Sequence, residues 1–137
     1  MKRLFLLLVI VSMTHFLVPG AGDDIRVETM PPVVIKTIPQ AGDTGVDSSL
    51  KEIRVTFSKE MKTDNQWSWV KISGDTFPKI VGNTYYLNDK KTCVLPVKLE
   101  PGKTYVIWIN RGQYNYFKDK NNNSAIPYLL VFETSGG

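Results

Sequence analysis

The sequence has little of the chemistry on which most catalytic centres depend. Among 137 residues it contains one cysteine, Cys93, and one histidine, His15. A single cysteine excludes an internal disulfide, so the domain must be stabilised by its hydrophobic core. The longest apolar run is interrupted by Ser12 and His15. It is therefore shorter than the roughly 20 apolar residues that a membrane-spanning helix needs.

The first residues instead have the pattern of a secretory signal. A positive start at Met1–Arg3 precedes an apolar run at Leu4–Val11, and small residues follow near Gly20. We therefore expect residues 1–22 to be a signal peptide that meets the membrane only transiently, with a retained anchor as the alternative. Its removal would take away the only histidine. A mature chain without histidine has no Ser-His-Asp or Cys-His catalysis and no histidine-ligated zinc.

A polar linker is expected over residues 23–31, and short apolar segments separated by turn signals follow it. The clearest strand covers residues 52–57, because Ile53, Val55 and Phe57 alternate with polar residues. Further strands are expected at 33–38, 67–72, 76–80, 85–87, 92–97, 104–110 and 128–134. Pro78 and Pro96 place two of these segments at a sheet edge or a strand end. About seven short strands with regular turns predict an all-β, antiparallel Ig-like sandwich.

One local motif favours this fold. Residues 99–105 read L-x-P-G-x-x-Y, with Leu99, Pro101, Gly102 and Tyr105 at the specified positions. In Ig-like sandwiches, a tyrosine near the start of a late strand bonds its hydroxyl back to the upstream backbone. We interpret these four residues as a structural tyrosine corner, the alternative being an ordinary turn before a strand. Strand alternation then points Ile107 inward.

Three segments in order resemble a known family. The entry at 32–47, the strand I-R-V-T-F-S-K-E-M at 53–61, and the close at 117–134 with its F-E-T ending are similar to the bacterial Ig-like domain of the S-layer, or SbsA, type. The resemblance covers residues 32–135. It implies a β-sandwich outside the cytoplasm that acts as a spacer, structural or adhesive module. It implies no enzymatic activity and no cofactor.

The aromatic residues are more numerous than the core requires. Trp108 and Asn110 are expected to point outward, and Tyr114 and Tyr116 to lie in a loop. With Tyr86 as the fourth aromatic residue, Trp108, Tyr114 and Tyr116 form a candidate interaction surface for an extracellular protein or a cell-surface polysaccharide. A carbohydrate-binding module is therefore the alternative function. Trp67 and Trp69 share one strand face, and the sequence leaves open whether both are buried.

Other site chemistries find little support. Asp119, Asn121 and Asn123 have the spacing of calcium ligands, but the glycine and the distal glutamate of such a loop are missing, so a tight polar turn is expected. No pair of carboxylates suggests acid-base catalysis, and Cys93 is expected to be a small buried side chain without a resolving partner. Basic residues are scattered rather than clustered, which argues against nucleic acid. We therefore expect no enzyme, no metal and no cofactor, in an exported protein of the periplasm, the cell surface or the medium.

The signal interpretation gives a direct prediction. N-terminal sequencing of extracytoplasmic protein should find a chain that begins between Ala21 and Asp23, because the small residues there suit signal peptidase. An intact Met1 on a membrane-embedded product would contradict it.

Overall fold

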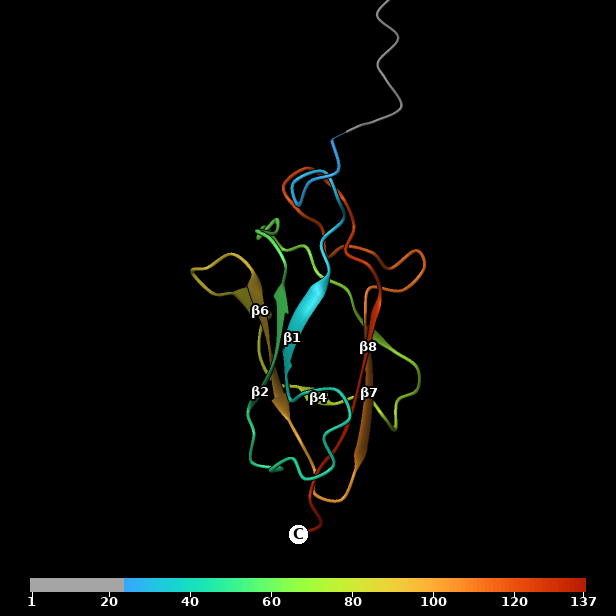
Figure 1. Cartoon of the computed structure of the whole chain (residues 1–137). Helices are drawn as coiled ribbons and strands as arrows, with labels where there is room; N and C mark the ends of the chain where they lie inside the picture. Colours follow the sequence, from blue (N-terminus) through green and yellow to red (C-terminus); the bar gives the residue numbers. More distant parts are fainter. Residues whose placement is uncertain (1–23) are drawn as a thin grey trace, which may run out of the picture.

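The computed structural model describes residues 24–137, and the predicted signal peptide lies outside them. Figure 1 shows two facing sheets. Within the described residues no helix is long and apolar enough to cross a membrane. The strands are β1 (Val34–Ile38), β2 (Glu52–Phe57), β3 (Trp69–Lys71), β4 (Lys79–Ile80), β5 (Tyr85–Tyr86), β6 (Thr92–Lys98), β7 (Thr104–Ile109) and β8 (Tyr128–Glu133). The all-β antiparallel sandwich expected from the sequence is confirmed.

The two sheets are linked along one side and separate along the other. The larger sheet has the order β1-β2-β6-β4, with β5 also paired to β6, and the smaller has the order β3-β7-β8. After β1 the chain crosses to the second sheet, where Val46 pairs in parallel with Thr134 and the Gly42 N–H donates to the Val131 carbonyl at 2.7 Å. This crossing joins β1 to β8. The opposite side has only the short strands β3, β4 and β5 at its edges.

The core lies between the sheets and follows the alternation in the sequence. Ile53, Val55 and Phe57 of β2 are 0% exposed, and they face inward-pointing residues of β7, including Ile107 at 0%. Cys93 on β6 is also fully buried, and burial raises the pKa of its thiol. The expectation of a buried cysteine is confirmed.

The expectation that Pro96 lies at a sheet edge or strand end is wrong. β6 is central, and Pro96 pairs with Glu52 of β2. The position tolerates proline because it falls where β5 has ended and β4 begins, so the missing N–H faces a break between two short strands. The Pro96 carbonyl is still used, since it accepts the N–H of Val81 at 3.1 Å.

Asn110 also departs from the prediction, because its side chain is fully buried rather than outward. It has a φ of 60°, which ends the alternation of β7. Its Nδ2 donates to the carbonyls of Phe117 and Ala125 at 3.0 and 3.1 Å, and its Oδ1 accepts the Phe117 N–H at 3.0 Å. Asparagine tolerates the left-handed conformation, and here it ties the following loop to the core.

The residues of the L-x-P-G-x-x-Y motif come together at the turn before β7. The Glu100 N–H donates to the Tyr105 hydroxyl at 2.8 Å, and the Tyr105 ring is 1% exposed with its centroid 5.4 Å from that of Phe132. Gly102 has a φ of 63°, a left-handed conformation that glycine adopts without strain. Leu99, 5% exposed, belongs to the same core cluster as Tyr105.

This geometry predicts the effect of removing the hydroxyl. Tyr105→Phe keeps the ring but leaves the Glu100 N–H unpaired, and it should lower the free energy of unfolding by about 1–3 kcal/mol. Denaturant melts measure this loss. Tyr114→Phe, at a side chain 54% exposed, is the matched control and should leave the melt nearly unchanged. Equal melts for Tyr105→Phe and the wild type would contradict a stabilising corner.

Candidate functional site

The open side of the sandwich contains a groove of about 560 Å³. It lies between the edge strand β3 of one sheet and the β4–β5 region of the other, because these short strands do not close the gap. Four of the side chains that line this groove are aromatic, and we therefore call it the aromatic groove. Its lining residues are Trp67, Ser68, Trp69, Val70, Lys71, Ile80, Thr84, Leu95, Tyr114 and Tyr116.

The aromatic walls come from two segments, the start of β3 with the residues just before it and the loop between β7 and β8. Trp69 is half-buried and meets the buried Phe117 edge-on, with ring centroids 5.2 Å apart. Tyr114 and Tyr116 are 54% and 53% exposed. Their loop is held against β3 by the Tyr116 N–H, which donates to the Ser68 hydroxyl at 2.9 Å. Anchored backbone and exposed rings together form a preformed apolar surface.

The structure separates the four aromatic residues predicted to form one surface. Tyr114 and Tyr116 line the aromatic groove, whereas Trp108 does not. Trp108 pairs with Val70 of β3 on the outer face of the smaller sheet, and the Arg111 guanidinium lies 5.4 Å from its ring centroid. Trp108 is therefore half-buried and belongs to a different face.

Tyr86 is the clearer correction. It was expected to be exposed, but it packs against the core, and its hydroxyl is buried beside the Cys93 thiol. Burial raises the pKa of Tyr86 strongly. Tyr86 is buried because it pairs with Cys93 across β5 and β6. Paired side chains point to the same face of a sheet, and for Cys93 this is the face toward the core. Trp67 and Trp69, and not Tyr86, line the aromatic groove. These two tryptophans have the same-face spacing noted in the sequence, and both are half-buried.

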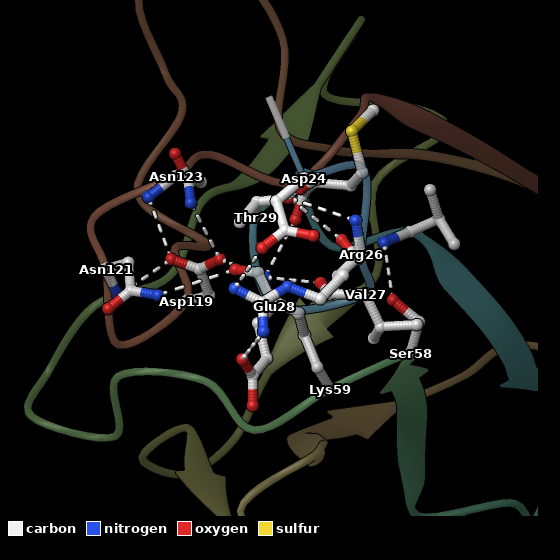
Figure 2. Close-up of polar contacts among 12 residues, drawn as sticks. Asp24, Arg26, Val27, Glu28, Thr29, Ser58, Lys59, Asp119, Asn121 and Asn123 are labelled. Carbon is white, nitrogen blue, oxygen red and sulfur yellow. Dashed lines mark hydrogen bonds and ion pairs between the residues drawn. The ribbon is translucent and has the colours of Figure 1, made fainter. Parts of the chain in front are cut away.

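Apart from the aromatic groove, a polar site attaches the N-terminal segment to the domain, as Figure 2 shows. The Lys59 ammonium lies within 2.9, 2.9 and 2.7 Å of the carbonyl oxygens of Val27, Glu28 and Met30. It also lies 2.6 Å from a carboxylate oxygen of Asp119. We call this arrangement the Lys59 clamp. It joins the expected linker, the end of β2 and a late loop through one nearly buried cation.

Asp119 is held as firmly as Lys59. Its carboxylate accepts the N–H groups of Asn121 and Asn123, each at 2.9 Å, and its side chain is 1% exposed. Burial alone would raise the pKa of Asp119, but hydrogen bonds from Lys59 and Asn123 outweigh it and lower that pKa. The tight polar turn expected for D-x-N-x-N is confirmed, with Asn122 at a φ of 69°. Across residues 24–137 no group of three or more His, Cys, Asp or Glu side chains could hold a metal ion.

The comparisons with known proteins agree with this architecture. A family model described as a bacterial Ig-like domain matches residues 28–134. The chain belongs to the bacterial Ig-like domain family. This membership confirms the resemblance found in the sequence motifs, and the match begins within the clamped segment.

The comparisons with solved structures and with curated sequences add little to the family assignment. The Ig-like chain is similar to the S-layer protein rSbsC(31-844), whose crystal structure it matches with 18% identity and a TM-score of 0.48. That match covers 77% of this chain and 14% of the S-layer chain. No curated protein sequence matches the chain significantly.

The Lys59 clamp predicts how this Ig-like domain responds to loss of the cation. Lys59→Met should lower the free energy of unfolding by about 3–5 kcal/mol, because it leaves the Asp119 carboxylate buried without its partner. It should also speed trypsin cleavage after Arg26, since the segment loses its attachment. Denaturant melts and timed proteolysis measure the two effects.

Lys120→Met is the matched control. Lys120 pairs with Glu60 in the same region, but both side chains are largely exposed. Exposed ion pairs contribute little to stability, so this variant should melt and digest like the wild type. Equal behaviour of the two variants would contradict a structural role for the clamp.

Proposed function

We propose that this protein is an exported, non-catalytic Ig-like module of the cell surface or its surroundings, acting as a spacer, structural or adhesion and interaction element. One observation carries the proposal. The clamped N-terminal segment and the C-terminus lie at opposite ends of the domain in Figure 1. A chain that enters at one end and leaves at the other suits a module that holds its neighbours apart, and the Lys59 clamp makes the entry point rigid.

The carboxylates support a non-catalytic module. A general acid at neutral pH needs a raised pKa. Here the Ser49 N–H lowers the pKa of Asp47. For Asp89, burial raises the pKa, but hydrogen bonds from Thr92 and Lys91 outweigh it and the net direction is downward. These groups, like Asp119, serve turns and loops by accepting backbone hydrogen bonds.

The location rests on two independent features. The first 22 residues have the signal pattern, and bacterial Ig-like domains are typical of extracytoplasmic proteins. We propose that the mature chain consists of a linker at 23–31, part of it clamped, and the Ig-like domain at 32–135. Its partners are extracellular proteins or cell-surface polysaccharides, with no nucleic acid and no cofactor.

The spacer role is tested by the rigidity of the entry point. Spin labels are placed at Glu28→Cys and Ser135→Cys, because the Glu28 side chain is 80% exposed and the Ser135 N–H is bonded to the Val46 carbonyl. Cys93 is buried and stays unlabelled. Electron spin resonance should find one narrow distance distribution. It should broaden in Lys59→Met and stay narrow in Lys120→Met, and a broad distribution in the parent protein would overturn the rigid spacer.

The aromatic groove favours carbohydrate binding as the second candidate. Exposed rings stack on the apolar faces of sugars, and Tyr114 and Tyr116 present such rings beside two half-buried tryptophans. A glycan array separates this candidate from the first. Saturable binding that is lost in Tyr114→Ala and kept in Trp108→Ala would support it, because Trp108 lies on another face. No binding to any glycan would reject it.

A further inference from the structure

The edge of β3 presents backbone groups that lack partners. The Asn110 N–H donates to the Ser68 carbonyl at 3.1 Å, so these two residues form a hydrogen-bonded pair. In an antiparallel ladder such pairs alternate, and Val70 with Trp108 is therefore the next one. The N–H and C=O groups of Trp69 and Lys71 point the other way. Among residues 24–137 they have no hydrogen-bond partner on that side, because β3 ends its sheet.

This free edge runs along the aromatic groove. Trp69 and Lys71 are two residues apart, so their side chains share the face that lines the groove. Leu95 of β6, 1% exposed, also lines it, and Ile80, 49% exposed, lies across from β3. A strand added to β3 would place every second side chain over this apolar space.

The charge in the groove further defines the occupant. Lys71 is the one charged residue among those that line it, and no carboxylate does. Lys71 forms no ion pair with any side chain of residues 24–137. An occupant with a negative charge beside Lys71 is therefore complementary to the groove.

We propose that the β3 edge accepts an extended acidic segment of a partner protein as an added antiparallel strand. The partner residue opposite Lys71 is Asp or Glu, and the residue two positions later lies opposite Trp69 and inserts an apolar side chain into the aromatic groove. The partner thus carries the pattern acid-x-apolar. Main-chain hydrogen bonds supply affinity and the alternate side chains supply specificity. A sugar would stack on the aromatic rings, but it would not form strand-like hydrogen bonds with the backbone of Trp69 and Lys71.

The inference rests on the proposed role as an interaction module and names the partner's chemistry. The probes are four seven-residue peptides with Glu at the third position, Val, Leu, Ile or Phe at the fifth, and Thr elsewhere. Binding is followed by NMR with amide hydrogen exchange. At saturation, exchange of the Trp69 and Lys71 N–H groups should slow about tenfold or more, as new ladder hydrogen bonds form. The Val70 N–H, already bonded to β7, should change little.

Two matched sets of variants identify the strand. N-methylation of the peptide at positions three and five removes the N–H groups that face β3 and should abolish binding, whereas N-methylation at position four should preserve it. Lys71→Gln should weaken binding about two- to fivefold, as loss of an exposed ion pair does. Lys36→Gln, at an exposed residue of β1 in the other sheet, should not.

Other outcomes overturn the proposal. Peptide binding without protection of Trp69 and Lys71, or binding insensitive to the position of N-methylation, would exclude strand addition. Binding of glycans but of no peptide would make the aromatic groove a sugar site. If no peptide binds while the spin-label distances stay narrow, strand addition fails and the spacer role stands.

Discussion

Burial of one face of β2 against one face of β7 is the constraint on which the rest of the structure depends. A chain with a single cysteine has no internal disulfide. Its stability therefore comes from buried side chains such as Phe57 and Ile107. Because side chains alternate along a strand, burying one face fixes the register of both sheets. The registers in turn fix where each connecting loop begins.

Three sets of hydrogen bonds and ion pairs hold loops that lie outside this core. Tyr105 ties the turn before β7, Asn110 ties the loop after it, and Lys59 ties the N-terminal segment to Asp119. Each one satisfies backbone groups or charges that burial would otherwise leave unpaired, which is costly. The spacer proposal rests on the Lys59 interaction, which attaches the segment by which the chain enters the domain.

The proposed interaction surface lies where the sandwich is incomplete. One side is closed by the crossing of residues 42–46 to β8, whereas the other has only strands of two or three residues. The resulting gap is both an aromatic groove and an unpaired strand edge. Long flat edges invite aggregation, and β3 limits that risk because it is short and carries the charged Lys71.

The sequence by itself determined the sandwich, the inward face of β2, the buried cysteine and the polar turn at Asp119, because each follows from alternation or from local turn chemistry. It did not determine which aromatic residues meet. Trp108, Tyr114 and Tyr86 look alike in one dimension, yet pairing across strands sends Trp108 to an outer face and Tyr86 to the core. The Lys59 clamp also required the tertiary structure, since it joins residues 28, 59 and 119 of the chain. Spacing within a strand is set by backbone geometry, whereas contacts between distant segments depend on how the two sheets pack.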